Sequence, residues 1–333
     1  MIELNKISAL GHSLNRPECV LSHSSGLLFT SDWSEAGGVS IVSPNGNVQK
    51  IISNESEFIV RPNGVGVEQS GSFLVAHLGN EDGGVYRLHP SGDLEEVLTM
   101  VDGENIPPSN YIHIDHLGRF WVTVSTKKNP RATAYKSDVA DGFIILIDKN
   151  GAKVVADNLG YTNECLVHPD GNRLFVNETF ARSLTSFDID RHGCLSNRKT
   201  ICEFGAGTFP DGMTFDSDGG IWITSIISNR VIRVKENGSQ TLFIEDVDTA
   251  HLDEVERAFE SNNLGRPHLD QVKSDKLKNI SSLAFGGKNL QTAFLGCLLD
   301  ERIYCFNTTY TGIEPNHWNA PLNKLFPFLK NVS

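Results

Sequence analysis

Positive charge is scarce in this chain of 333 residues, which has 29 lysines and arginines against 41 aspartates and glutamates, a formal net charge of −12. Nucleic acids and anionic membranes are bound through basic surfaces, so neither is an expected partner. No apolar stretch approaches the roughly 18 residues that read as a membrane-spanning helix. The first residues also lack the basic start and apolar core of a secretory signal. We therefore expect a cytoplasmic protein.

Paired cysteines are lacking as well. The six cysteines include no Cys-x-x-Cys motif, and most lie in apolar runs that resemble strands. We expect buried free thiols rather than a set of disulfides or a zinc site. The residues are Cys19, Cys165, Cys194, Cys202, Cys297 and Cys305.

What the chain does contain is a repeated pattern. It has 30 glycines, 18 phenylalanines and 39% hydrophobic residues, which suggests many turns, many strands and a real core. In each repeat a polar residue at the third position precedes four mostly apolar residues, a turn containing glycine, and a second apolar run. This order predicts a β-hairpin. The repeats are residues 16–33, 61–78, 108–125, 161–178, 209–226 and 279–296.

The spacing of these hairpins predicts the fold. The third-position residues follow one another at intervals of 45, 47, 53, 48 and 70 residues, and further strand-and-turn units lie between them. Six units of four strands each are typical of an all-β, six-bladed β-propeller, here expected as one domain over residues 1–333. The long last interval contains an insertion at 248–275 between blades 5 and 6. Its stretch HLDEVERAF predicts a short amphipathic helix with Leu252, Val255 and Phe259 on one buried stripe. The insertion is either a lid or an inert surface excursion.

The third-position residues are the candidate functional group. The innermost strand of each propeller blade lines the central channel, so these six side chains are expected to form a ring at one mouth. All can offer oxygen and none is cationic, and carboxylates that converge repel one another unless a cation lies between them. Oxygen ligands suit Ca²⁺ first, with Mg²⁺ or Mn²⁺ as alternatives and Zn²⁺ less favoured. The other interpretation is that the residues only start strands and cap turns. They are Glu18, Asn63, Asn110, Asn163, Asp211 and Ser281.

Several segments resemble a known family. They are RPECVL at Glu18, LGYTNECLVHPDGNRLFVNET at Asn163, FPDGMTFDSDGGIWIT at Asp211 and SSLAFGGKNLQTAFLG near the end of the chain. They are similar to the senescence marker protein/gluconolactonase/luciferin-regenerating-enzyme group of six-bladed propellers, to which diisopropyl fluorophosphatase is related in architecture. The resemblance covers about residues 14 to 306 and leaves the insertion outside the usual pattern.

The resemblance implies a single catalytic divalent metal at the channel mouth and hydrolysis of a lactone or related ester. It implies Glu18, Asn163 and Asp211 as metal ligands, with Asn110 binding metal or substrate. Sugar-lactonase members carry an arginine two residues before that asparagine, where this chain has Pro108, which puts a sugar-acid lactone in question. The candidates to replace that arginine are Arg16 and Arg61.

Within such a site Asp211 is the expected catalytic carboxylate, as general base or as nucleophile, and Glu18 the electrostatic ligand. Asn110, Asn63 and Ser281 are expected to contact substrate. His77 ends the second strand of its hairpin and is a further substrate contact, unless it is a hydrogen-bonded structural histidine. Four residues at equivalent strand ends are expected to orient the ligands: Asp32, Ser125, Glu178 and Ser225.

Other functions stay open at this point. A propeller can bind Ca²⁺ as a regulatory or interaction module without turnover, because fold does not determine function. An organophosphate hydrolase and a metal-free condensing enzyme of the strictosidine synthase type are further alternatives, although Asn163 and Asp211 count against the latter. Two carboxylates in the ring favour the hydrolase. Its expected partner is a small lactone or ester, and we expect a monomer or a small homo-oligomer.

Overall fold

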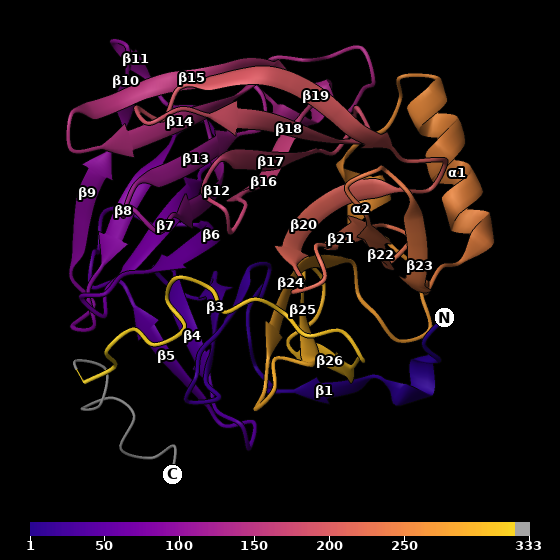
Figure 1. Cartoon of the computed structure of the whole chain (residues 1–333), viewed down its shortest axis with the longest axis horizontal. Helices are drawn as coiled ribbons and strands as arrows, with labels where there is room; N and C mark the ends of the chain where they lie inside the picture. Colours follow the sequence, from indigo (N-terminus) through magenta and orange to yellow (C-terminus); the bar gives the residue numbers. More distant parts are fainter. Residues whose placement is uncertain (324–333) are drawn as a thin grey trace.

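Six antiparallel sheets of four strands surround a central channel in the computed structural model, which describes residues 1–323 (Figure 1). The sequence therefore predicted the fold class correctly. Blade 1 consists of β2 (Val20–Ser22), β3 (Leu28–Asp32), β4 (Gly38–Val42) and β5 (Val48–Ile52). Blade 2 consists of β6 (Pro62–Val67), β7 (Phe73–Leu78), β8 (Gly83–Leu88) and β9 (Leu94–Leu98). Blade 3 consists of β12 (Ser109–Ile114), β13 (Phe120–Val124), β14 (Gly142–Asp148) and β15 (Gly151–Leu159).

The second half of the ring repeats this arrangement. Blade 4 consists of β16 (Thr162–Val167), β17 (Arg173–Glu178), β18 (Ser183–Ile189) and β19 (Leu195–Glu203). Blade 5 consists of β20 (Phe209–Phe215), β21 (Ile221–Ile226), β22 (Arg230–Val234) and β23 (Gln240–Ile244). Blade 6 consists of β24 (Ile280–Gly286), β25 (Thr292–Cys297) and β26 (Ile303–Asn307), with β1 (Ser8–Leu10) as its outer strand. The short pair β10 (Met100–Val101) and β11 (Glu104–Asn105) and the single-turn helices η1 (Leu4–Lys6) and η2 (Arg131–Ala134) complete the regular structure outside the insertion.

The outer strand of blade 6 comes from the other end of the chain. β1 pairs antiparallel with β26, with Ala9 opposite Tyr304. Figure 1 shows this strand, in indigo, beside the yellow strands of the last blade. The first blade and the last blade are therefore joined by main-chain pairing, which the sequence repeat alone did not predict.

Aromatic side chains fill the spaces between neighbouring blades. Phe29 and Phe73 join blades 1 and 2 with ring centroids 5.4 Å apart. Trp222 and Phe285 join blades 5 and 6 at 5.3 Å, in an edge-to-face arrangement. Burial of such large side chains is the main stabilising contribution of the fold, and the apolar faces of the blades thereby explain the chain's many phenylalanines.

The insertion between blades 5 and 6 forms two helices, α1 (Thr249–Glu260) and α2 (Arg266–Asp270). Asp248 caps α1 by accepting a hydrogen bond from the backbone N–H of His251 at 2.8 Å. α1 buries Val255 and Phe259 as the sequence predicted, but the third buried side chain is His251, while Leu252 is half-buried. No helix in residues 1–323 is long and apolar enough to cross a membrane.

Ion pairs and aromatic contacts hold the insertion against the propeller. Glu256 accepts hydrogen bonds from Arg182 and from the N–H of Gly207, both at 2.7 Å. The guanidinium of Arg182 lies 4.3 Å from the ring centre of Phe209 and 4.2 Å from that of Phe259. α1 is therefore docked on blades 4 and 5 rather than standing free in solvent.

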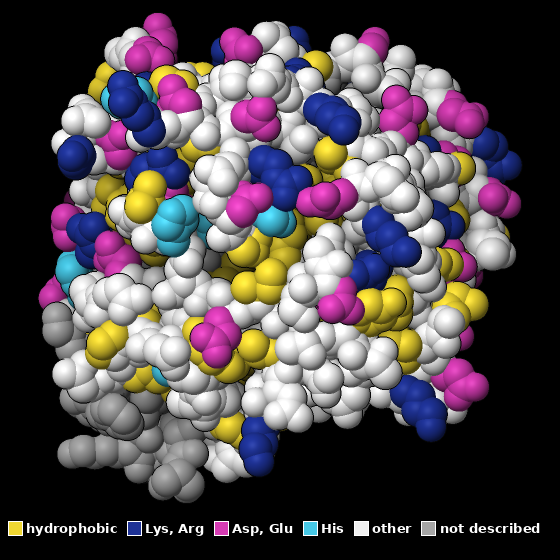
Figure 2. All heavy atoms as spheres, viewed as in Figure 1, with side chains coloured by type: hydrophobic (Ala, Val, Ile, Leu, Met, Phe, Trp, Pro, Cys, Tyr) yellow, Lys and Arg dark blue, Asp and Glu magenta, His cyan; other side chains and the backbone are white. Residues whose placement is uncertain are grey.

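The ring residues lie at one end of the channel. At the other end the channel opens into a cavity of about 700 Å³. Inner-strand side chains such as Val67 and Phe215 line it, together with residues 313–317, which cross this end of the channel. Figure 2 views this side and shows hydrophobic side chains in a hollow near the middle of the face, with histidines close by.

The cysteines are all free, as expected. Cys194 is exposed and Cys305 is half-buried, and the other four are buried. The prediction of buried thiols is therefore correct for Cys19, Cys165, Cys202 and Cys297.

Candidate metal centre

A cavity of about 40 Å³ lies at the other mouth of the channel, and five of the six ring residues line it. They come from five different blades, so residues up to 193 positions apart in the chain, from 18 to 211, face the same small space. The five are Glu18, Asn63, Asn110, Asn163 and Asp211.

Irregular strand pairing accompanies four of these five side chains, and the fifth, Glu18, lies just before β2. In each of the inner strands β6, β12, β16, β20 and β24 the register shifts next to the ring residue, for example between Pro210 and Met213 around Asp211. A β-bulge interrupts the alternation of side chains and re-aims one of them. Gly212 permits the bulge around Asp211, because a Cβ there would lie 2.4 Å from the carbonyl oxygen of Ser281 on the next blade.

Hydrogen bonds occupy the N–H groups of the three amides. Asn163 donates from Nδ2 to Thr179 Oγ1 at 3.0 Å, and Asn110 donates to Ser125 Oγ at 2.9 Å. Asn63 donates to the backbone carbonyl of Asn110 at 3.0 Å, and its own Oδ1 is buried without a hydrogen-bond partner in the described structure. The side-chain carbonyl oxygens are therefore the amide atoms available to a cation, and that of Asn110 also accepts from Asn63 Nδ2 at 3.3 Å.

The two carboxylates lie close enough to influence each other. Burial, and after it the negative charge of Glu18, raises the pKa of Asp211 well above its usual value. Arg16 pairs with Glu18 at 2.8 Å and stacks on the ring of Trp33 at 4.5 Å. Arg16 and Arg131 both act to lower the pKa of Asp211, but its burial and the charge of Glu18 outweigh them.

These observations fit a hard divalent cation. A buried amide oxygen without a partner and a pair of close carboxylates are the features that such an ion would satisfy. Residues 1–323 contain no cluster of three or more His, Cys, Asp or Glu side chains placed to hold a metal. An ion at this mouth would therefore depend on amide oxygens beside the two carboxylates, and a soft metal that prefers sulfur or imidazole fits less well.

Ser281 and His77 do not line this cavity. Ser281 donates its hydroxyl hydrogen to the backbone carbonyl of Glu18 at 2.8 Å, which joins blade 6 to blade 1. His77 is 2% exposed, accepts from the N–H of Arg61 at 2.9 Å, and lies 3.3 Å from Asp82. The burial and hydrogen bonds of His77 are those of a structural histidine, the alternative that the sequence analysis left open for this residue.

The residues expected to orient the ligands divide into two groups. Ser125 contacts the ring residue Asn110 directly, and Ser225 accepts from the backbone N–H of Phe209, two residues before Asp211. Asp32 accepts hydrogen bonds from Ser34 and Ser40 and pairs with Lys50 at 2.8 Å, and Glu178 binds Thr185 and Arg198. The two acidic residues therefore fix neighbouring strands within their own blades.

Sequence reasoning missed Glu164. This residue follows Asn163 in β16, is 6% exposed, and accepts a hydrogen bond from the N–H of Met213 at 2.9 Å. Burial, and then the charges of Asp211 and Glu18, raise the pKa of its carboxyl well above the usual value. A signal was present in the repeat, since none of the other five repeats has an acidic residue directly after the ring position.

Sequence reasoning also missed most of the cavity wall. Arg131 and Tyr135 belong to the loop between β13 and β14, and Arg266 and Leu269 belong to α2 of the insertion. The insertion therefore forms part of the mouth. Loop residues have no fixed place in the repeat, so the spacing argument could not find them.

A family model described as the SMP-30/Gluconolactonase/LRE-like region matches residues 16–246, more than two thirds of the chain. The chain belongs to this family. It resembles the Bacillus subtilis protein named "Putative sugar lactone lactonase YvrE", with 22% identity over 217 residues that cover 64% of this chain and 62% of that protein. The match thus spans a little less than two thirds of that relative's length.

Solved structures of this SMP-30/gluconolactonase-like fold agree with the architecture. A gluconolactonase from Xanthomonas campestris is similar with a TM-score of 0.66 and 18% identity, over 90% of this chain and 89% of that one. A calcium-binding protein, regucalcin, from Agrobacterium tumefaciens is similar with a TM-score of 0.61 and 14% identity, over 92% and 91%. At these identities the likeness shows the fold.

Proposed function

We propose that the protein is a divalent-metal-dependent hydrolase that opens a lactone or a related ester. The observation that carries the proposal is the meeting of Glu18, Asp211 and three asparagines at one cavity of the channel mouth. Membership of a family named after gluconolactonase supports the reaction class. Ca²⁺ is the proposed ion, because the donors are oxygens and a similar fold is that of a calcium-binding protein.

In this proposal Glu18, Asp211, Asn163 and Asn110 would hold the ion. A divalent cation supplies Lewis-acid polarisation of the ester carbonyl and makes a nearby water more acidic. Asp211 takes the proton from the attacking water or attacks the acyl carbon itself. In either case water ends bonded to the acyl carbon, the ring C–O bond breaks, and the leaving oxygen receives a proton.

The surrounding residues bind and orient. Thr179 and Ser125 hold the carboxamides of Asn163 and Asn110, and Arg16 fixes one carboxylate oxygen of Glu18. Tyr135, Tyr161 and Phe180 also line the cavity, so a bound substrate would meet an apolar wall beside the polar ring.

The direct test is hydrolysis of aliphatic, aromatic and sugar lactones by metal-stripped protein, alone and with Ca²⁺, Mg²⁺, Mn²⁺ or Zn²⁺. We expect metal-dependent turnover that falls by about 10³-fold or more in Asp211→Asn, because that variant loses both a ligand charge and the base. Asp218→Asn, at an exposed turn of the same blade, is the matched control.

Binding distinguishes the alternatives. Stabilisation by Ca²⁺ without turnover of any lactone would favour a calcium-binding propeller that is not an enzyme, the role suggested by the regucalcin-like fold. Absence of any metal-dependent thermal shift in the wild-type protein would contradict the proposal as a whole.

A further inference from the structure

Three guanidinium groups meet at the mouth beside the candidate metal centre. Arg16 precedes β2, Arg131 begins η2 in the loop between β13 and β14, and Arg266 begins α2 of the insertion. All three line the same cavity as the ring residues. This is a high density of positive charge for a chain with few basic residues.

The partners of the three arginines differ. Arg16 is paired with Glu18, and Arg266 forms two hydrogen bonds to the carboxylate of Asp270, at 2.8 and 3.0 Å. Arg131 forms no ion pair with any residue of the described part of the chain (1–323). Its charge is therefore available to a ligand.

Neutral contacts hold Arg131 beside the ring. It donates from Nη2 to Ser125 Oγ at 3.1 Å, the same oxygen that accepts from Asn110 at 2.9 Å. Its guanidinium carbon lies 5.6 Å from the ring centre of Tyr161. One serine hydroxyl thus connects Arg131 to a ring residue and holds its guanidinium beside the ring.

An aromatic wall completes this side of the cavity. Tyr135, Tyr161 and Phe180 contact one another with ring centroids 4.6 to 5.4 Å apart. Tyr161 lines the same cavity as Arg131 and Arg266, and burial raises the pKa of its hydroxyl well above the usual value. The wall restricts where a substrate can extend from the ring.

The charges at the mouth favour an anion once an ion is bound. A divalent cation would balance Glu18 and Asp211, which leaves Asp270 as the acidic partner of the arginines. We propose that the substrate carries a carboxylate that binds between Arg131 and Arg266 of the insertion. This inference rests on the proposed hydrolase function. A planar carboxylate matches the fork of a guanidinium and needs less of the limited space than a tetrahedral phosphate.

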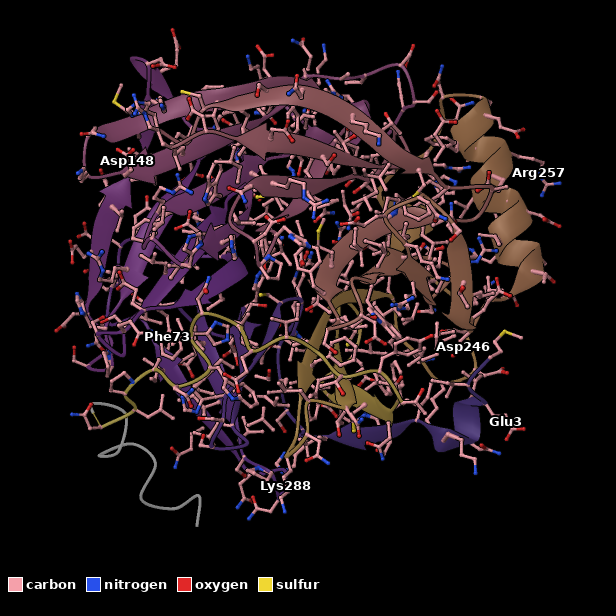
Figure 3. All side chains as sticks on the ribbon, viewed as in Figure 1. Glu3, Phe73, Asp148, Asp246, Arg257 and Lys288 are labelled. Atoms are coloured by element: carbon pink, nitrogen blue, oxygen red, sulfur yellow. The ribbon has the colours of Figure 1, made fainter. Side chains whose placement is uncertain are left out.

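A matched pair of lactones tests this inference. The probes are 5-oxotetrahydrofuran-2-carboxylate and its uncharged carboxamide, compared by kcat/KM in the Ca²⁺-loaded protein. We expect a preference for the carboxylate that falls by about 10- to 100-fold in Arg131→Gln, the usual contribution of a hydrogen bond to a charged group. Arg257→Gln, on the outer face of α1 and directed away from the propeller (Figure 3), is the control and should keep the preference.

A binding measurement separates this inference from the proposed function. The ring-opened acid, 2-hydroxyglutarate, is titrated calorimetrically into the Ca²⁺-loaded wild type, Arg131→Gln and Arg257→Gln. Binding that weakens tenfold or more in Arg131→Gln alone supports the inference even when no lactone of the full panel is hydrolysed, an outcome that would contradict the hydrolase.

Two results would overturn the inference. One is equal kcat/KM for the carboxylate and the carboxamide with no change in Arg131→Gln, which leaves a hydrolase with a neutral substrate. The other is failure of 2-hydroxyglutarate to bind, or inorganic phosphate binding more tightly than it does, since the site would then have no carboxylate specificity.

Discussion

At the scale of single residues, Thr179 shows how a hydroxyl in the cavity wall positions a ligand. Its hydroxyl accepts a hydrogen bond from Asn163 Nδ2 at 3.0 Å and donates to the carbonyl of Pro210 at 2.8 Å. We expect Thr179→Val to lower Ca²⁺ affinity by about 10- to 100-fold, because the carboxamide of Asn163 can then rotate. Calorimetric titration with Ca²⁺ measures the change.

Thr30→Val is the control for that substitution. Thr30 is fully buried in β3, and its Oγ1 has no hydrogen-bond partner in the described structure. Exchange of this hydroxyl for a methyl group removes no contact, so Ca²⁺ affinity should stay within about twofold of wild type. An equal loss of affinity in both variants would mean that Thr179 acts through general stability and not through Asn163.

At the scale of elements, the hairpin after Asp211 depends on a buried carboxylate. Asp216 accepts from Trp222 Nε1 at 2.7 Å, from Arg233 Nε at 2.6 Å, and from the N–H of Gly220 at 2.8 Å. Asp115 binds Trp121 and Arg119 in the same way in blade 3. In the motif DSDGGIW, one of the most specific parts of the sequence, Asp216 thus holds the turn and the following strands together by hydrogen bonds.

The hydrogen bonds of Asp216 predict that the stability of the fold is sensitive to acid. Burial acts to raise the pKa of Asp216, but hydrogen bonds from Arg233, Trp222 and Gly220 outweigh it and lower the pKa. A lowered carboxyl pKa stabilises the fold above the unfolded-state pKa, and this stability is lost as pH falls through the folded-state pKa. We expect the free energy of unfolding, measured in urea, to fall steeply below about pH 4.

Asp216→Asn should reduce that pH dependence. It also leaves the buried Arg233 without its charge partner, so we expect a loss of about 3 to 5 kcal/mol at pH 7. Asp218→Asn, two residues away and exposed, should change neither quantity. An unchanged acid limb in Asp216→Asn would show that other carboxylates dominate acid unfolding.

At the scale of the whole molecule, the sequence predicted the features that follow from the repeat and missed those that lie outside it. Glu18 and Asp211 recur in one register, so their meeting in the channel could be predicted without knowing any contact. Arg131 and Arg266 lie in η2 and α2, within connections between strands that have no counterpart in the repeat, so the repeat could not place them. Bulges and non-local contacts determine which side chains reach the cavity, and the placement of Ser281 against a backbone carbonyl is one result.

The ring of blades is also closed by residues that are far apart in the chain and that the repeat does not include. The three-residue strand β1 lies outside every repeat, yet it completes blade 6, and Ile2 donates its N–H to the carbonyl of Phe243 in blade 5 at 2.6 Å. Ile7, 2% exposed, packs into the cluster around Trp222 and Tyr304. The first ten residues therefore tie together the last two blades before the chain enters blade 1.

Deletion of residues 1–10 should therefore weaken the whole propeller rather than one blade. It removes the pairing partner of β26, which leaves an exposed strand edge, and it leaves the last blade joined to the first through fewer main-chain hydrogen bonds, such as that from Cys297 to Pro17. We expect a lower Tm and concentration-dependent association in size-exclusion chromatography. Ile7→Ala should keep the pairing and cost about 2 to 4 kcal/mol, and Asn5→Ala, exposed in η1, should cost little. A deletion variant that stays monomeric with an unchanged Tm would show that packing between blades closes the ring without β1.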